Sequence, residues 1–412
     1  MSVATSSGKC FNLSDMLRSY LLPAVLAFAC SATAPGAFAQ AMPNMPGMEH
    51  SHHHEATPED LEKLGTVHFP VSCTEKVRAP FERGIALLHS FGYVETEKQF
   101  REITAQDPTC AMAHWGIAMT QYQELWGRPS PEMVKAGTEE MAKAEALAKS
   151  AAITPREHAY IDALNGFFLA DAKDFQTAAD GYVTSMKALH EAYPDDTEGS
   201  AFYALALIAS VAPDDTSLRK ETAALAVLTP LFAAHPDHPG LAHYIIHTCD
   251  TPKLAPQGLE AAKVYAKIAP SSAHALHMPG HIFARLGMWQ DDIASNEASV
   301  AASYKAEADH EPGAAHQMHA KQFLIYAYLQ TGQDQKAREL TQQMRSVSER
   351  MAAMPGMDDM KNSGHFFDNQ LSAIYPMEMT TGRRCRRSSR RQDQKTMRPS
   401  TPIGDKALPL GT

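Results

Sequence analysis

Cysteine and positive charge are both in short supply in this sequence. Six Cys in 412 residues are far too few for a disulfide-rich scaffold. Lys and Arg together number 37 against 47 Asp and Glu, and the net charge of −10 argues against a surface built to bind nucleic acid. Apolar side chains nevertheless make up 44% of the chain, enough to bury a sizeable core, so the composition excludes disorder throughout.

Catalytic signatures are missing as well. The chain contains no HExxH zinc-hydrolase motif, no G-x-S-x-G, no P-loop and no G-x-G-x-x-G between a strand and a helix. A hydrolytic metal centre would therefore lack its usual general base. Because a helical scaffold can still host a site, the sequence leaves enzyme activity open, but it favours a protein without catalysis.

No apolar run is long enough to span a membrane. The longest leading stretch, Tyr20 to Ala29, contains Pro23 and covers about ten residues, against roughly 20 for a spanning helix. Lys9 and Arg18 precede it, and Ala37-Phe38-Ala39 follows with the A-x-A form of a signal-peptidase site. We therefore expect residues 1–39 to be a cleaved signal peptide, no stable membrane span after cleavage, and a periplasmic or secreted protein.

Residues 40–67 are predicted to be a flexible tether, because they show no apolar periodicity. Thioethers suit Cu(I), and imidazoles suit Cu(II), Zn or Ni, so this segment is a possible metal-binding stretch. The alternative is a low-complexity linker that happens to be rich in His. Its candidate ligands are Met42, Met45, Met48, His50, His52, His53 and His54.

Residues 68–379 show helical stretches of 12 to 18 residues separated by Pro, Gly and Asp-Pro, which predicts an all-α fold. In several pairs, a small residue on the first helix lies twelve positions before the position on the second helix that packs closely against it. Gly84 precedes Thr96 in this way, and Gly280 precedes Asp292. Gly166 with Ala178 keeps the same spacing. Aromatic residues follow four later in two pairs, at Phe100 and Tyr182. These positions resemble the tetratricopeptide repeat, a two-helix unit of about 34 residues.

Four segments narrow the resemblance: HSFGYVETEKQF (89–100), DPTCAMAHWGIAM (107–119), HPGLAHYIIHTCDTP (238–252) and HALHMPGHIFARLGMW (274–289). They are similar to a group of exported bacterial tetratricopeptide proteins without an assigned activity. The resemblance implies a right-handed α-solenoid of about seven helix pairs, whose concave groove binds a peptide or protein partner. We place the pairs near 78–109, 110–150, 155–194, 198–236, 238–270, 272–308 and 313–352, with an eighth beginning at His365.

Histidines gather on several of the predicted first helices. Their spacings of three, four and seven residues put each set on one helical face, and the resemblance implies that those at the sixth and seventh pairs line the concave groove. Two His at i and i+4 can share one Zn or Cu ion. The alternatives are that they hydrogen-bond among themselves, cap helix ends or contact a bound peptide. The candidate ligands are His243, His247, His274, His277, His281, His316 and His319.

Cys73 comes just before the first predicted helix pair, and Cys110 lies where the second pair begins. After export, a disulfide between them would staple the entry segment onto the helical array, with two unpaired thiols as the alternative.

The composition changes again after Met379. Residues 380–412 have no periodicity, and residues 383–398 contain seven Arg and one Lys against one Asp, so we expect a disordered basic tail. One interpretation is a tail that binds anionic lipid or nucleic acid. The other, which we favour, is a slipped reading frame.

The leading hypothesis is therefore a periplasmic scaffold that binds a partner in its groove, with no cofactor assigned. The alternative is a copper- or zinc-binding protein with a His-lined groove, which could extend to a metal-dependent enzyme.

Overall fold

The computed structural model describes residues 63–126, 128–150, 153–170, 175–308 and 313–352. These residues form helices joined by short turns, and no strand occurs among them, so the predicted all-α fold is confirmed. The chain divides into two compact units, residues 1–260 and 261–412, which are described separately below. The predicted signal peptide, most of the tether, the eighth helix pair and the basic tail fall outside the described residues.

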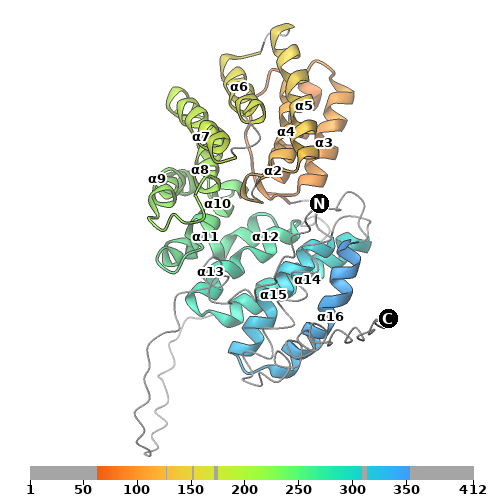
Figure 1. Cartoon of the computed structure of the whole chain (residues 1–412), viewed down its shortest axis with the longest axis vertical. Coiled ribbons are helices and arrows are strands. Elements are labelled where there is room, and N and C mark those ends of the chain that lie inside the picture. The colour runs from red at the N-terminus through yellow and green to blue at the C-terminus, as the bar shows by residue number, and fades with distance from the viewer. Residues whose placement is uncertain (1–62, 127, 151–152, 171–174, 309–312, 353–412) are drawn as a thin grey trace, which may run out of the picture. The chain divides into compact units, whose positions relative to one another are not determined.

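The helices follow one another in pairs (Figure 1). Within the first unit the two members of each of the first four pairs pack together, as expected for a solenoid of helix pairs. The fifth pair begins in this unit with α10, and its second helix α11 spans the division at residue 260. The helices of these five pairs are α2 (Glu75–His89) and α3 (Tyr93–Gln106), α4 (Ala111–Tyr122) and α5 (Pro131–Ser150), α6 (Pro155–Leu169) and α7 (Phe175–Ala192), α8 (Thr197–Ala209) and α9 (Arg219–Ala234), and α10 (Pro239–Cys249) and α11 (Ala255–Ile268).

The second unit contains the sixth and seventh pairs. Its core is formed by apolar side chains of α14, α15 and α16, including Ile293, Ile325 and Met344. The first helix of the sixth pair is interrupted, because Pro279 has no backbone N–H to continue the hydrogen-bond ladder and starts a new helix instead. The helices are α12 (Ala273–His277), α13 (Pro279–Leu286), α14 (Trp289–Ala308), α15 (Gly313–Gln330) and α16 (Asp334–Ala352). All seven pairs begin and end within a few residues of the predicted positions.

The entry segment before α2 is tied down at several points. The predicted disulfide joins Cys73 to Cys110. The backbone N–H of Ser72 donates to Glu157 at 2.7 Å, which couples the segment to the start of α6. Leu64 and Val67 are buried. Leu64 and Val67, at the end of the predicted tether, therefore pack with the folded unit.

The inner side of the first unit is filled by its own side chains. Phe69 of the entry segment is 1% exposed, and its ring lies 5.3 Å from Phe81, 5.8 Å from Trp115 and 5.1 Å from Tyr160. These three partners come from α2, α4 and α6, the first helices of successive pairs. Helix α10, the first helix of the fifth pair, contacts α2, so the row of first helices curves back on itself (Figure 1). The open trough expected from the resemblance is occupied in this unit.

The predicted small residues pack closely at two of the three positions. A Cβ on Gly84 would lie 2.9 Å from the ring of Phe100, and one on Gly280 would lie 2.7 Å from Asp292, so both positions require a side chain smaller than Ala. A Cβ on Gly166 would meet nothing within 4 Å. The prediction for Gly166 is wrong, because this residue faces away from its partner helix.

Candidate metal centre

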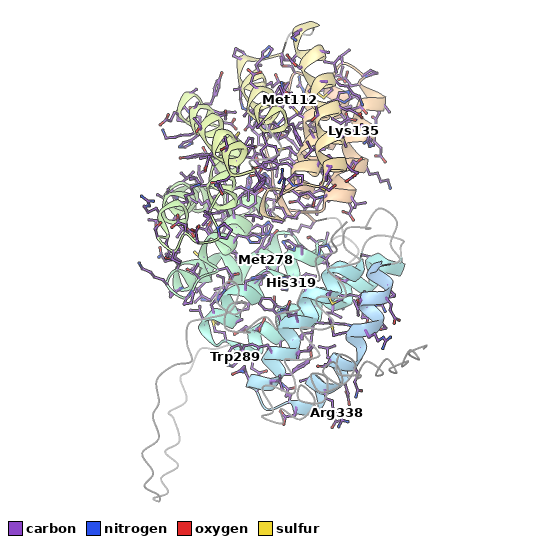
Figure 2. The ribbon with its side chains drawn as sticks, viewed as in Figure 1. Met112, Lys135, Met278, Trp289, His319 and Arg338 are labelled. Carbon is purple, nitrogen blue, oxygen red and sulfur yellow. A yellow bond between two sulfur atoms is a disulfide. The ribbon has the colours of Figure 1, made fainter. Side chains whose placement is uncertain are left out.

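Three imidazoles of the second unit converge at one point. His277 ends α12, and His281 lies in the first turn of α13. His319 lies on α15, where Figure 2 labels it. One ligand nitrogen from each lies within 4.8 Å of the other two. The ring of His277 is 4.8 Å from that of His281 and 4.5 Å from that of His319, and the last two are 5.4 Å apart. We call these three residues the histidine centre.

The spacing of His277 and His281 along the chain contributes to this geometry. His277 and His281 are four residues apart, the spacing that places two side chains on one helical face. Their Nε2 atoms are hydrogen-bonded at 2.9 Å, a bond that a shared metal ion would replace. Two nitrogens bound to one tetrahedral Zn²⁺ at about 2.0–2.1 Å would be about 3.3–3.4 Å apart, so a small movement of one ring would admit the ion.

A second layer of hydrogen bonds fixes the orientation of His277. Asn296 on α14 donates through Nδ2 to the carbonyl oxygen of Asp292 at 2.9 Å and to Asp292 Oδ1 at 2.7 Å. Its Oδ1 therefore faces His277 and accepts from Nδ1–H at 2.6 Å. This tautomer leaves the lone pair on Nε2, the atom that faces His281. Metal-binding His in proteins are commonly held by such a bond on the other ring nitrogen.

Burial keeps His277 in the form that binds metal. Its side chain is 2% exposed, and burial lowers the pKa of His277 well below 6.5, with His319 and His281 adding to the effect. Neutral imidazole is the ligand form, so no proton on this ring opposes binding near neutral pH. Burial also raises the pKa of Asp292 to about 8, although the hydrogen bond from Asn296 opposes the shift.

The other predicted ligands of the second unit lie beside the histidine centre. His274 is one helical turn before His277, with 6.3 Å between their rings, and its ring is 5.9 Å from that of His316. Burial lowers the pKa of His316 as well. Phe323 provides an apolar wall, with its ring 4.6–5.3 Å from all three rings of the centre. Five of the seven predicted ligands are thus grouped in this unit.

The remaining two predicted ligands, His243 and His247, belong to the first unit. Their rings are 4.7 Å apart on α10 and pack on Phe91 at 4.4 and 5.5 Å. His243 Nδ1–H donates to the backbone carbonyl of His89 at 2.6 Å, which joins α10 to the end of α2. This contact gives His243 a packing role in holding the two helices together.

A second buried cluster was not predicted from the sequence. His89 Nε2–H and His238 Nε2–H donate to the two oxygens of Glu198, at 2.6 and 2.9 Å. The remaining nitrogens are also engaged: the Tyr244 hydroxyl bonds to His89 Nδ1 at 2.7 Å, and the Leu241 N–H donates to His238 Nδ1 at 3.3 Å. Every ring nitrogen of this cluster is engaged by a residue outside the other imidazole, so a metal would have to displace all four bonds, and we interpret the cluster as structural. His89 begins one of the four segments that carry the family resemblance (89–100). Glu198 is 109 residues further along the chain, so no helical spacing could have predicted their contact.

The fold and the histidine centre define an all-α helical-repeat protein with convergent imidazoles on the first helices of its last two described pairs. No family model matches the chain, and no curated protein matches it. Among solved structures, the tetratricopeptide domain of P58(IPK) overlaps 79% of this chain and 100% of its own length, at 12% sequence identity and a TM-score of 0.20. The fold assignment rests on the helix pairing itself.

Among the described residues, no helix combines the length and the apolar character that crossing a membrane requires.

Proposed function

We propose that this protein binds a transition-metal ion, Zn²⁺ or copper, at His277, His281 and His319. The observation that carries the proposal is the convergence of three ligand nitrogens within 4.8 Å of one another. The bond from Asn296 supports it, because it leaves the His277 lone pair on the nitrogen that faces the other two rings. Three protein ligands leave one position of a tetrahedral ion for water or a fourth group.

The test is metal titration of the full chain purified without a polyhistidine tag. Replacing His281 and His319 with Ala removes two ligands that are half-buried, while His277 keeps its bond to Asn296. We expect this double variant to lose one equivalent of tightly bound Zn²⁺ or Cu²⁺ and to keep its helical circular dichroism. Deletion of residues 42–54 should remove any tether binding and leave the equivalent at the histidine centre.

The matched control replaces two His outside the cluster, His68 and His235, which are both exposed. This variant should bind metal as the unchanged protein does. Fewer than about 0.2 equivalents retained by the unchanged chain after gel filtration would rule out the metal site, as would equal binding by the His281→Ala, His319→Ala variant and the control.

We also propose that the helix pairs form a scaffold for a peptide or protein partner, in the periplasm or outside the cell. The helical-repeat architecture supports this function, and so does the partial exposure of His281, His319 and Phe323 on the first helices of the second unit. A pulldown from periplasmic extract should recover a partner with the unchanged chain and lose it when Phe323 is replaced by Ala.

If residues 1–39 are removed on export, the N-terminal sequence of the exported protein should begin at Gln40.

A further inference from the structure

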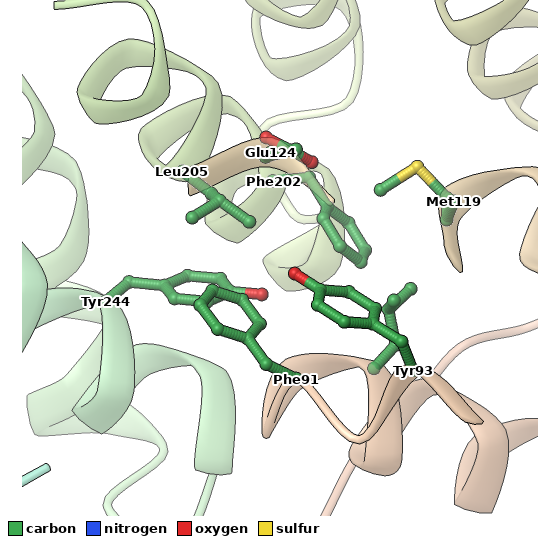
Figure 3. Close-up of a pocket in the computed structure, with 8 residues that line it drawn as sticks. Phe91, Tyr93, Met119, Glu124, Phe202, Leu205 and Tyr244 are labelled. Carbon is green, nitrogen blue, oxygen red and sulfur yellow. The ribbon is translucent and has the colours of Figure 1, made fainter. Parts of the chain in front are cut away.

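The first unit contains a small cavity among aromatic side chains, remote in sequence from the histidine centre. Its volume is about 10 Å³, enough for a single water-sized particle. Phe91 and Tyr93 line it from the joint between α2 and α3, Phe202 from α8 and Tyr244 from α10. Glu124 completes the wall from η2 (Glu124–Trp126), the short turn that follows α4. Figure 3 shows the Tyr93 and Tyr244 hydroxyl oxygens pointing toward the middle of the group.

Glu124 is the unusual member of this wall. Glu124 is buried, with 3% of its surface exposed, and neither of its carboxyl oxygens has a hydrogen-bond partner. Burial raises the pKa of Glu124 well above its usual value, and a cation bound beside it would favour the ionised carboxylate again. The cavity lining includes no Lys, Arg or His. A buried carboxyl without a partner costs free energy, and a ligand that bonds to its oxygens would offset that cost.

The backbone on both sides of the cavity adopts costly conformations. Phe91 has a φ of 55° and Gln123 a φ of 48°. Both lie in the left-handed backbone region that residues other than Gly rarely adopt. The turn at Phe91 places its ring in the wall, and the turn at Gln123 ends α4 so that Glu124 follows directly. Such strain persists where the surrounding structure enforces it, and it concentrates at ligand sites.

The lining determines which ligand would fit. It offers two carboxyl oxygens of Glu124 and the phenol oxygens of Tyr93 and Tyr244, surrounded by aromatic faces. Potassium requires a larger shell of oxygens than this wall supplies. An ammonium ion has one heavy atom, a single positive charge and N–H groups that can bond to oxygens and to aromatic faces. We propose that this cavity binds an ammonium ion, held by the Glu124 carboxylate and the rings of Phe91, Phe202 and Tyr244.

The first test compares thermal unfolding of the full chain in ammonium, sodium, potassium and methylammonium chloride at equal ionic strength and pH 7. Ammonium should raise the melting temperature, and the increase should grow with the logarithm of its concentration because the ligand binds only the folded state. Methylammonium should stabilise less, since the cavity accepts one heavy atom. The Glu124→Gln variant should melt at the same temperature in all four salts.

Glu140→Gln is the matched control, because Glu140 is a second buried glutamate in the same unit, but it already has His114 and Lys143 as partners. This variant should keep the full ammonium response. A second measurement uses ¹⁵N-labelled ammonium with the unchanged protein. A bound ammonium resonance with nuclear Overhauser contacts to the Phe202 and Tyr244 rings is expected, and this readout does not depend on the variant folding.

Equal melting temperatures in ammonium and sodium, with no bound ammonium resonance, would overturn the proposal and leave a proton or a water molecule as the partner of Glu124. Potassium stabilising as strongly as ammonium would overturn the choice of ion. An undiminished ammonium response in Glu124→Gln would exclude this carboxyl as the binding group.

Discussion

At the scale of single residues, Gly280 controls the support of the histidine centre. A Cβ at this position would lie 2.6 Å from Asn296 Nδ2 and 2.7 Å from Asp292 Oδ1, so Gly280→Ala must displace the side chain that orients His277. We expect a loss of about 1–3 kcal/mol in the free energy of unfolding. Because supporting residues of metal sites typically contribute 10- to 100-fold in affinity, Zn²⁺ binding should weaken by roughly tenfold or more. Urea unfolding and zinc titration measure the two effects.

Gly166→Ala is the control for this change. The added Cβ meets nothing within 4 Å, and Ala is favoured over Gly inside a helix, so stability should rise by about 0.5–1 kcal/mol with unchanged zinc affinity. A Gly280→Ala protein that binds zinc as tightly as the Gly166→Ala protein would show that Asn296 does not position His277.

The residues that the sequence predicted well are those whose partners lie close in the chain or whose chemistry is specific. Cys73 and Cys110 pair as expected, and the spacing of His277 and His281 anticipated a shared face. Glu124 escaped prediction because a single Glu after a helix has no distinguishing pattern. Its environment depends on Phe202 and Tyr244, which arrive from helices much later in the chain.

At the scale of elements, the entry segment behaves as a part of the first three helix pairs. The disulfide closes a loop of 37 residues, and restricting the unfolded chain by that amount corresponds to about 3–4 kcal/mol in the chain-entropy account. Replacing both Cys73 and Cys110 with Ala should therefore lower the denaturation midpoint of the first unit. Backbone amides of residues 64–74 should also exchange hydrogen faster, as mass spectrometry would detect.

The matched control is Cys249→Ala, which removes a buried free thiol from the same unit. Its effect should be smaller, about 1 kcal/mol, because it removes only one buried sulfur and leaves a small cavity. If the two variants lost equal stability and exchanged hydrogen alike at residues 64–74, the disulfide would not be what holds the entry segment.

The element order was the most predictable feature of the chain. Helix boundaries follow local signals such as Thr154 and Pro155, where a capping box and an N-terminal proline begin α6. The packing of the entry segment was harder to predict. The segment 64–67 is short and lacks periodicity, and its place in the folded unit is shown by the burial of Leu64 and Val67 and by the Thr66 N–H, which donates to the Asp237 carbonyl at 3.0 Å.

At the scale of the whole molecule, the first unit depends on contacts between helices that are far apart in sequence. The hydrogen bond between His89 and Tyr244 spans 155 residues, and that between His89 and Glu198 spans 109. A repeat pattern describes how each helix pair packs on the next. It therefore does not indicate whether α10, the first helix of the fifth pair, contacts α2, the first helix of the first pair. This closure is why the inner side was predicted as an open trough and is filled instead.

Glu198 is the residue on which this closure depends most directly, since one carboxylate accepts from both His89 and His238. Burial opposes its ionisation, but the two His outweigh that effect and lower the pKa of Glu198 below its usual value of 4.5. A carboxyl with a lowered pKa stabilises the fold above pH 4.5 and loses that contribution as the pH falls. In Glu198→Gln an amide N–H₂ would face an imidazole N–H, so we expect a loss of about 2–4 kcal/mol at pH 7.

The pH dependence distinguishes this role from general damage to the core. The difference in unfolding free energy between the unchanged protein and Glu198→Gln should shrink progressively below about pH 4.5, because the unfolded chain binds a proton at Glu198 in this range while the folded protein does not. Glu132→Gln, an exposed carboxyl on α5, should stay within about 0.5 kcal/mol of the unchanged protein at pH 7. A difference that stays constant from pH 7 to pH 3 would mean that Glu198 acts through packing alone, and that the closure of α10 onto α2 does not depend on its charge.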